Sequence, residues 1–266
     1  MGSNNRHIVE LRKVQKSFGD QMVLDGIDLA IETGQTTVVI GRSGVGKSVL
    51  LKHIMVLLRP DAGQVFFDGQ RIDQLREREL VPMRARCGFL FQGGALFDSM
   101  TALENVAFPL RDHLSLRRRQ AESLAMEKLE VVGMGDHAGK WPSQLSGGEQ
   151  KRVSLARAIA LGPEVILYDE PTTGLDPPRA HIICELIIKL QQRLGITSVV
   201  VTHDMTAASK VAHRIVMLHE GQLVADGTPD QIAKLTDPNV SRFVRGLPEE
   251  DELATIASKQ LSSPAK

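Results

Sequence analysis

The hydrophobic and polar positions follow a strand period at the start of the chain. Residues 8–40 contain three stretches in which apolar and polar side chains alternate, IVELRKV, MVLDGIDLAI and TTVVI, and Gly19 and Gly34 separate them. Alternation with a period of two is typical of half-buried strands. We therefore expect strands of a largely antiparallel sheet in this part of the chain.

The pattern changes after residue 40 to a long apolar run. The run SVLLKHIMVLL, residues 48–58, is apolar at nearly every position, and PDAG follows it at 60–63. Such a run with such an ending predicts a buried helix. The next segment, VFFDGQRI at 65–72, contains the Asp-Gly pair that favours a tight hairpin turn.

Helical periodicity dominates the middle of the chain. Between residues 121 and 132 the apolar side chains fall on one helical face, and Gly133 and Gly135 follow them. These apolar residues are Ala121, Leu124, Ala125, Leu129 and Val132. The basic run 117–119 comes just before, and we expect it on the solvated side.

A strand–helix–strand pattern begins at residue 165. The stretches VILYDE, 165–170, and TSVVVTH, 197–203, are apolar enough for buried strands, and Gly195 marks the end of the helix between them. The apolar stripe of that helix is Ile182, Ile183, Leu186, Ile187, Leu190 and Leu194. Two strands joined by a helix form a βαβ unit, so we expect an α/β fold with a parallel sheet here.

Composition limits the size of the core and the kinds of partner. The chain has 266 residues, of which 42% are apolar, and this is enough for a well-buried core. Lys plus Arg (32) equals Asp plus Glu (32), so no net field draws the protein to nucleic acid. Cys87 and Cys184 lack metal-ligand spacing, and we expect both to be small core residues in a reducing compartment.

The ends of the chain carry no targeting pattern. The N-terminal MGSNNRH has no apolar core, and apolar runs such as VVI at 38–40 fall far short of the ~20 residues that span a bilayer. We therefore expect any role at a membrane to depend on a partner. The polar tail at 247–266 is expected to be frayed or to bind another subunit.

One glycine-rich segment has the form G-x-x-x-x-G-K-[ST]. It is GRSGVGKS, 41–48, and it lies between a predicted strand and a predicted helix, which is the context that this motif requires. Glycine lets the backbone N–H groups of a helix N-terminus approach phosphate oxygens. Lys47 would reach the β- and γ-phosphates, and Ser48 would bind Mg²⁺. The alternative is an ordinary glycine-rich turn.

Two carboxylates end the strand pattern VILYDE. Asp169 and Glu170 stand at its C-terminal end, where the ligands of open α/β sheets bind. Alone, such a pair is often a surface turn. After a phosphate-binding loop, Asp169 would hold the Mg²⁺ shell and Glu170 would act as general base on the attacking water.

The segment LSGGEQKRV, 145–153, resembles the signature of the ATP-binding cassette (ABC) ATPases, and the other motifs occur in the order of that family. They are Gly41–Ser48 as Walker A, Gln92 as the Q-loop glutamine, Ser146–Glu149 as signature, Asp169 and Glu170 as Walker B, Gly174–Asp176 as D-loop, and His203 as the switch histidine. The resemblance implies a P-loop NTPase fold of the ABC type. This fold combines a mixed RecA-like core sheet with an antiparallel β subdomain and an α-helical signature subdomain.

The resemblance also implies the domain limits and the site. The ATPase domain would span 8–246, with the β and core parts at about 8–90 and 160–246 and the helical subdomain at about 91–159. ATP and Mg²⁺ would be the cofactors. Catalytic roles would fall to Glu170, His203, Gln92 and Lys47, and the metal would lie at Ser48, Gln92 and Asp169. The nucleotide would bind to Phe18, Gly41, Arg42, Ser43, Gly44, Val45, Gly46, Lys47, Ser48, Ser146, Gly147, Gly148, Glu149 and Asp176.

The signature offers a second phosphate-binding surface. Ser146, Gly147 and Gly148 supply a hydroxyl and bare N–H groups at the start of a helix. In the family, two cassettes pair head to tail so that Walker A of one and the signature of the other enclose each ATP. We therefore expect a homodimer whose closure is the power stroke.

Four positions depart from the usual pattern of the family. Phe18 would stack on adenine where Tyr is more common, and the alternative is a core phenylalanine. Glu149 stands where Gln is common, Thr173 where Ser is common, and Val49 where Thr is usual. None of these departures removes a catalytic group, so we expect an active ATPase.

Three classes of ABC ATPase are alternatives at this point: a transporter subunit, a DNA-repair or chromosome-organising ATPase, and a translation-linked protein. The second class inserts a coiled coil or zinc modules between Walker A and the signature, whereas here Ser146 follows Lys47 by only 99 residues. The third class usually carries two cassettes in one chain. A transporter subunit is favoured, peripheral at the cytoplasmic face of the inner membrane and without a nucleic-acid partner.

The segment FQGGALFDSMTALENVAFPLRDH, 91–113, resembles that of the Mla/Mce group of ATPases. This group moves phospholipids or other hydrophobic molecules between bacterial membranes with a permease and an Mce-domain protein. DPNVSRFVRG, 237–246, is similar to the end of the catalytic domain in that group. The resemblance implies lipid transport; a cassette for another substrate, such as amino acids, would share the core motifs and is the alternative.

The loop FQGGALFDSMT, 91–101, joins a polar end to an apolar one. We expect Gln92 to sense Mg²⁺ and the γ-phosphate. Leu96, Phe97 and Met100 would form a groove that accepts a cytoplasmic helix of the permease, so that the permease docks at the loop from Gln92 to Thr101. The two glycines between these ends would let the segment swing.

Overall fold

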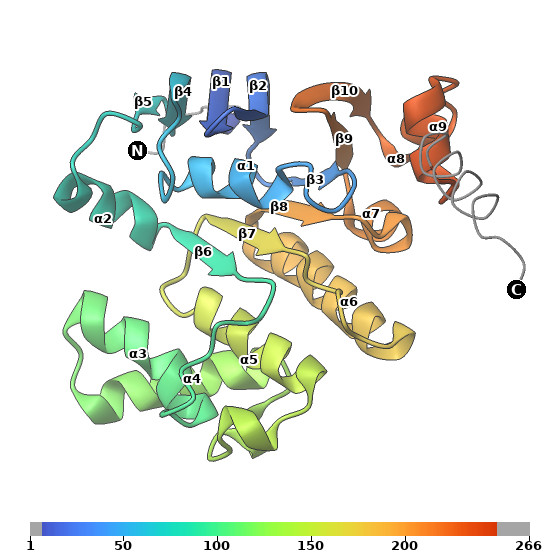
Figure 1. Ribbon diagram of the computed structural model, residues 1–266. Coiled ribbons are helices and arrows are strands. Elements are labelled where there is room, and N and C mark those ends of the chain that lie inside the picture. The colour runs from blue at the N-terminus through green and yellow to red at the C-terminus, as the bar shows by residue number, and fades with distance from the viewer. Residues whose placement is uncertain (1–6, 249–266) are drawn as a thin grey trace, which may run out of the picture.

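A computed structural model of the protein describes residues 7–248, which form two β-sheets with helices packed around them (Figure 1). The first sheet has the strand order β2-β1-β4-β5 and the second the order β10-β9-β3-β8-β7-β6. The strands of the first are β1 His7–Phe18, β2 Gln21–Glu32, β4 Ala62–Phe67 and β5 Gln70–Arg71. Those of the second are β3 Thr36–Ile40, β6 Cys87–Leu90, β7 Val165–Asp169, β8 Thr197–Thr202, β9 Arg214–His219 and β10 Gln222–Gly227.

The first sheet is antiparallel, as its alternating pattern predicts. β1 pairs antiparallel with β2 and with β4, and β4 pairs antiparallel with β5. The hairpin between β4 and β5 turns at Asp68 and Gly69, which have φ of 50° and 78°. Two successive residues with positive φ are what the tight hairpin turn favoured by Asp-Gly requires.

The second sheet is mainly parallel, and it takes in a strand that we expected elsewhere. β3 pairs parallel with β8 and β9, and β7 pairs parallel with β6 and β8; β10 alone in this sheet is antiparallel, to β9. The expectation that 36–40 belongs to the antiparallel sheet is therefore wrong. All five residues of β3 are buried, because both faces of the parallel sheet are covered.

The helices of the described residues have the following bounds: α1 Lys47–Ile54, α2 Glu77–Ala85, α3 Ala102–Leu114, α4 Arg118–Val131, α5 Gly147–Ala158, α6 Pro177–Leu194, α7 Met205–Val211, α8 Pro229–Ala233 and α9 Pro238–Val244. Short 3₁₀ turns lie at Gly135–His137 and Pro142–Gln144. α3, α4 and α5 gather at the bottom of Figure 1, away from the antiparallel sheet at its top.

α1 is shorter than the apolar run predicts. It ends at Ile54, and Val56 beyond it has a φ of 50°. The guanidinium of Arg84 in α2 donates hydrogen bonds to the carbonyls of Met55 (3.1 Å) and Val56 (2.8 Å). These contacts satisfy carbonyls at the helix end, so the chain turns while its apolar side chains stay buried.

The parallel sheet separates two hydrophobic clusters. Val38 and Ile40 of β3 face a cluster built with α3 to α6, whereas Val39 faces one built with α1 and the antiparallel sheet. On α6 the expected stripe is too wide, since Ile182 is 44% and Leu194 59% exposed. The helix buries only the narrower face that turns toward the sheet.

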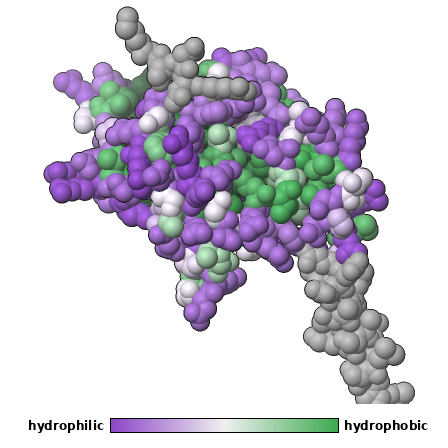
Figure 2. All heavy atoms as spheres, turned by 90° about the horizontal axis from the view of Figure 1, so that it is seen from above, coloured by the Kyte–Doolittle hydropathy of each residue, from purple (hydrophilic) through white to green (hydrophobic). Residues whose placement is uncertain are grey.

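The remaining surface is mostly polar. Purple, hydrophilic residues cover most of the face drawn in Figure 2, and green, apolar ones gather in one area of it. In the described part of the chain, no helix is long and apolar enough to cross a membrane. The tail expected at 247–266 lies, from residue 249 on, outside the described residues, and the domain limits given above stay a prediction.

Candidate functional site

The glycine-rich loop between β3 and α1 has a backbone that only glycine fits at two positions. Gly41 and Gly46 have φ of 156° and 110°. A Cβ on Gly41 would lie 2.4 Å from the Leu218 carbonyl oxygen, and one on Gly46 would lie 2.8 Å from Cγ1 of Val23. No side chain caps the N-terminus of α1 and no acidic residue occupies its first turn. Its N–H groups therefore suit an anion.

Lys47 is held at the centre of this loop. Its ammonium donates hydrogen bonds to the carbonyls of Gly41 (2.7 Å) and Arg42 (2.8 Å), and it lies 3.4 Å from Oε1 of Glu170. Burial lowers the pKa of Lys47, and the neighbouring Glu170 carboxylate opposes this change. The charge is thus fixed where the loop and the carboxylate meet.

Ser48 and Asp169 form a pair of oxygen ligands. Oγ of Ser48 donates a 2.7 Å hydrogen bond to Oδ1 of Asp169. Burial raises the pKa of Asp169, while the hydrogen bond from Ser48 opposes the rise. A hydroxyl next to a carboxylate is a donor set that suits Mg²⁺, so these residues fit the metal that the sequence implies.

Glu170 is a buried carboxylate with several donors. Its Oε2 accepts hydrogen bonds from the hydroxyls of Thr173 (3.0 Å) and Thr202 (3.3 Å) and lies 2.9 Å from Nδ1 of His203. Burial is the largest single influence and would raise its pKa, but the hydrogen bond from His203, the charge of Lys47 and the hydrogen bond from Thr173 together lower it. Glu170 is therefore ionised near neutral pH and can accept a proton.

Backbone strain also marks Glu170. It has a φ of 47°, in the left-handed region that non-glycine residues rarely adopt. Such strain persists only where surrounding contacts fix it, and it is common at functional sites. Sequence reasoning gave Thr202 no role, although its place just before His203 at the end of β8 is a usable signal.

A cavity of about 320 Å³ joins residues that are far apart in the sequence. It is lined by Ser43, Gly44, Gly46, Lys47, Ser48, Val49, Gln92, Glu170, Thr173 and His203. The structure thus brings Gln92 and His203 to the glycine-rich loop. The other expected nucleotide ligands do not line this cavity; they are Phe18, Gly41, Arg42, Val45, Asp176 and the signature residues 146–149.

The signature caps α5 and lies beside the D-loop. Oγ of Ser146 accepts from the backbone N–H of Glu149 (3.4 Å), and the Glu149 carboxylate accepts from that of Ser146 (2.7 Å). Glutamate and glutamine can both complete such a capping box, so Glu149 keeps this role at the position where the family often has Gln. A Cβ on Gly148 would lie 3.1 Å from Cδ of Arg179, a contact that sequence reasoning missed.

Phe18 and Asp176 occupy exposed positions. Phe18 ends β1 with 49% of its surface exposed, and the ammonium of Lys16 lies 5.5 Å from its ring centroid. A core phenylalanine, the alternative above, is therefore excluded. Asp176 caps α6 by accepting from the N–H of Arg179 (2.9 Å).

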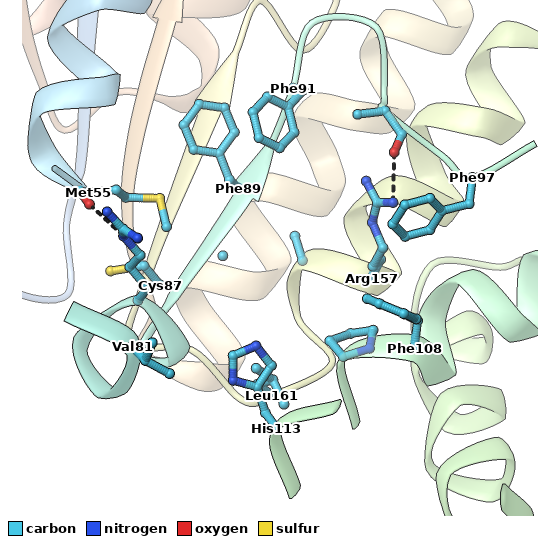
Figure 3. A pocket seen from close by; sticks show the side chains of 15 residues that line it. Met55, Val81, Cys87, Phe89, Phe91, Phe97, Phe108, His113, Arg157 and Leu161 are labelled. Carbon is cyan, nitrogen blue, oxygen red and sulfur yellow. Dashed lines mark hydrogen bonds between the residues drawn. The ribbon is translucent and has the colours of Figure 1, made fainter. Parts of the chain in front are cut away.

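A second and larger hollow, of about 570 Å³, lies between the core and the helices (Figure 3). We call it the groove. It is lined by Met55, Val81, Arg84, Cys87, Gly88, Phe89, Phe91, Ala95, Phe97, Phe108, Pro109, His113, Arg157, Ala158 and Leu161. Phe89 stacks on Phe91 at 4.1 Å between ring centroids, and Phe97 meets Phe108 edge-on at 5.1 Å.

The groove differs from the expected one in its residues. Phe97 lines it, but Leu96 packs partly buried against the core cluster and Met100 is not among the lining residues. Asn105 of α3 explains the difference, since its buried amide binds the backbone of Phe97 and Met100 and turns the loop. Only one of the three predicted apolar residues therefore belongs to this hollow.

The fold and the site define a P-loop ATPase. A phosphate-binding loop follows the central parallel strand β3; Asp169 ends β7, two strands away in the same sheet, and Glu170 follows it. The family profile described as "ABC transporter" matches residues 24–173. The chain belongs to the ABC transporter family, with the fold that the sequence predicts, and it is an ATPase that binds ATP with Mg²⁺.

Relatives at moderate identity cover nearly the whole chain. The chain is 40% identical over 242 residues to the intermembrane phospholipid transport system ATP-binding protein MlaF of Haemophilus influenzae, covering 91% of this chain and 92% of the relative. It is 38% identical to the probable ribonucleotide transport ATP-binding protein mkl of Mycobacterium tuberculosis, covering 95% of this chain and 72% of the relative.

Solved structures of similar fold exist as well. The ATP-binding cassette MJ0796, solved as a dimer in a post-hydrolysis state bound to ADP and Pi, is 35% identical with a TM-score of 0.77, covering 83% of this chain and 98% of that one. CbiO1 of Clostridium perfringens, part of the ABC transporter complex cbiONQ, is 26% identical with a TM-score of 0.79, covering 96% and 100%.

Proposed function

We propose that this ATPase is the energy subunit of a transporter that moves phospholipids or related lipids between bacterial membranes. The observation that carries the proposal is the 40% identity to an MlaF phospholipid transport ATPase over 92% of that protein. The groove supports it, because it provides a place for the membrane subunit that such a transporter needs.

A cassette for another substrate is the second candidate. The 38% identity to relatives named as probable ribonucleotide transport proteins favours it, although those relatives are longer and the chain covers 72% of them. An amino-acid transporter, the alternative raised by the sequence, belongs to the same candidate. The nucleotide site is the same under both candidates, so only the transported substrate separates them.

We infer the roles of the site residues around ATP from this geometry. The loop at 41–48 and Lys47 would hold the β- and γ-phosphates, and Ser48, Asp169 and Gln92 would hold Mg²⁺, which supplies charge neutralisation at the phosphates. Glu170 would accept the proton of the attacking water, while its hydroxyl donors and His203 keep its carboxylate ionised and oriented. Phe18 would stack on the adenine.

A second copy of the chain would complete each site. Ser146–Glu149 lie outside the cavity lined by the glycine-rich loop of the same chain. A head-to-tail pair would bring the signature of one copy, with Asp176 beside it, to the loop of the other. The dimeric state of the MJ0796 cassette supports this arrangement.

The groove would bind a cytoplasmic helix of the permease. Its lining is mainly apolar and aromatic, its basic groups are Arg84, His113 and Arg157, and it contains no carboxylate. This fits an amphipathic helix whose apolar face carries an acidic group. The subunit would then sit at the cytoplasmic face of the inner membrane through the permease, together with an Mce-domain protein.

Purification of the complex from the native membrane tests the proposal. The tagged chain would be extracted in mild detergent, and mass spectrometry would identify its partners and bound small molecules. A permease, an Mce-domain protein and bound phospholipid are the expected result. A solute receptor in the complex, without lipid, would contradict lipid transport and favour the second candidate.

A further inference from the structure

One face of α5 is turned toward the loop that follows β6. Lys151, Ser154 and Arg157 occur at every third position, so they follow one another along the same side of the helix. All three meet the backbone of the loop 92–95, whose first residue is Gln92. α5 begins at the signature, and its last residue, Ala158, lines the groove. The helix therefore contacts the signature, the loop that contains Gln92 and the groove.

Arg157 makes the most specific contacts. Its Nη1 donates to the carbonyl of Ala95 (2.8 Å) and its Nη2 to that of Gly94 (2.9 Å), as a planar fork across two successive carbonyls. Its guanidinium carbon also lies 5.6 Å from the ring centroid of Phe97. Figure 3 shows Arg157 beside the ring of Phe97, with a hydrogen bond to a backbone carbonyl of the loop, among the residues that line the groove.

The loop is pressed against α5 at Gly94. Gly94 has a φ of 77°, and a Cβ there would lie 2.8 Å from Oγ of Ser154. Ala95, which follows, has a φ of 49° although it has a side chain. The glycine thus allows the backbone of the loop to lie close to Ser154 of α5. The expectation that it lets the loop swing does not fit this geometry.

Lys151 continues the contact toward the nucleotide cavity. Its ammonium donates to the carbonyl of Gln92 and, at 3.4 Å, to that of Glu170. The backbone of Gln92 and that of Glu170 are therefore held by one side chain of α5. Gln92 lines the nucleotide cavity, and the contact of Lys151 with it is to its carbonyl alone.

We propose that Arg157 is a positioning residue, which sets Gln92 in the nucleotide cavity by holding the carbonyls of Gly94 and Ala95 while forming part of the groove. The proposal rests on the roles proposed above for Gln92 and for the groove. A helix that enters the groove contacts Arg157 and Phe97 directly. A shift of the guanidinium would move the two carbonyls and the chain that leads back to Gln92, two residues before Gly94.

A double-mutant cycle on the full-length protein tests this link. We expect Arg157→Met to lower kcat about tenfold with KM for ATP changed less than about twofold, because an effect confined to the transition state appears in kcat. The Mg²⁺ concentration for half-maximal activity should rise as well. Arg157→Lys should recover part of kcat, since one ammonium can reach one of the two carbonyls.

The decisive measurement is the combination with Gln92→Ala. If Arg157 acts through Gln92, the double variant should have the kcat of Gln92→Ala alone. Once the side chain of Gln92 is gone, the loss of its positioning by Arg157 can lower kcat no further. Additive losses, or an unchanged kcat and Mg²⁺ dependence in Arg157→Met, would overturn the proposal. A Gln92→Ala variant with normal kcat would also overturn the proposal that Arg157 positions Gln92. The proposal of lipid transport would not be affected, because the purified complex tests it separately.

Arg59→Met is the matched control. Arg59 also donates to two backbone carbonyls, those of Asp73 and Leu75 (2.6 Å for the latter), and it lines neither the nucleotide cavity nor the groove. We expect kcat and Mg²⁺ dependence to be unchanged in this variant. Thermal unfolding of every variant separates lost positioning from lost folding, because only the former changes kcat at an unchanged melting temperature.

Discussion

Glu170 and His203, 33 residues apart in the sequence, lie 2.9 Å apart between carboxylate Oε2 and ring Nδ1. Glu170 follows the end of β7, and His203 follows the end of β8, the strand that pairs with it in parallel. Parallel strands end at the same edge of a sheet, so the pairing of β7 with β8 brings these two side chains together.

The variant Glu170→Gln should bind ATP but not turn it over. The amide keeps the size of the carboxylate and loses the proton acceptor, and general-base catalysis contributes about 10²–10⁴-fold in rate. Phosphate release should fall by that factor while nucleotide affinity stays near that of the unchanged protein. Size-exclusion chromatography with ATP should show a trapped dimer. Substantial residual hydrolysis would mean that the proton acceptor is elsewhere.

The pH dependence should report the link between Glu170 and His203. The pKa of Glu170 is lowered below its ordinary value of 4.5, so its ionised form is favoured in the folded protein. This favourable contribution is present above the ordinary value and is lost as pH falls through the lowered pKa. The variant His203→Ala removes the contact and should move the acidic limb of the kcat/KM profile to higher pH. An acidic limb at its original position would show that His203 does not control this carboxylate.

The variant Phe97→Asp should weaken attachment to the permease and leave ATP binding intact. Phe97 is 42% exposed and lines the groove, so a carboxylate there would be forced into an apolar contact. Val131→Asp is the control, since Val131 is 52% exposed and does not line the groove. Co-purification of the permease measures the effect. Normal recovery with Phe97→Asp would show that the permease docks elsewhere.

Replacing the two glycines of the loop should have unequal costs. Gly94→Ala places a Cβ 2.8 Å from Oγ of Ser154 at a φ of 77°, and strain of this kind costs about 1–3 kcal/mol. Gly93→Ala meets no atom within 4 Å and should change the free energy of unfolding little. Denaturant unfolding measures both. Adding Ser154→Ala to Gly94→Ala should restore part of the loss, and equal costs for the two glycines would contradict this account.

Motif residues could be predicted closely from the sequence. The loop at 41–48, the pair Asp169–Glu170 and the signature at 146–149 each need particular residue types at fixed local spacing. Phosphate binding requires glycine near bare N–H groups, and metal binding requires oxygen ligands, so the chemistry leaves a local pattern. The parallel βαβ unit at 165–202 was equally predictable, because its strand and helix periods are unambiguous.

Contacts between distant segments could not be predicted. We grouped residues 36–40 with the alternating strands before them, but a local pattern does not show which sheet a strand joins, and the neighbours of this strand, β8 and β9, lie far along the chain. The residues that line the groove could not be predicted for the same reason. Leu96 and Phe97 are both apolar, but Asn105 holds the loop so that Leu96 packs against the core and Phe97 lines the groove.

The sequence by itself determined the family and the nucleotide chemistry, and it predicted the residues that would carry this chemistry. Only the tertiary structure decided which side chains make hydrogen bonds to these residues and their neighbours. Thr202 binds Glu170, Lys151 binds the carbonyl of Gln92, and Arg157 binds the carbonyls of Gly94 and Ala95. The physical reason is the separation of the contacting residues along the sequence. A motif binds its ligand through groups that are close in the chain, whereas these supports are hydrogen bonds across 32 to 63 residues whose partners only packing brings together.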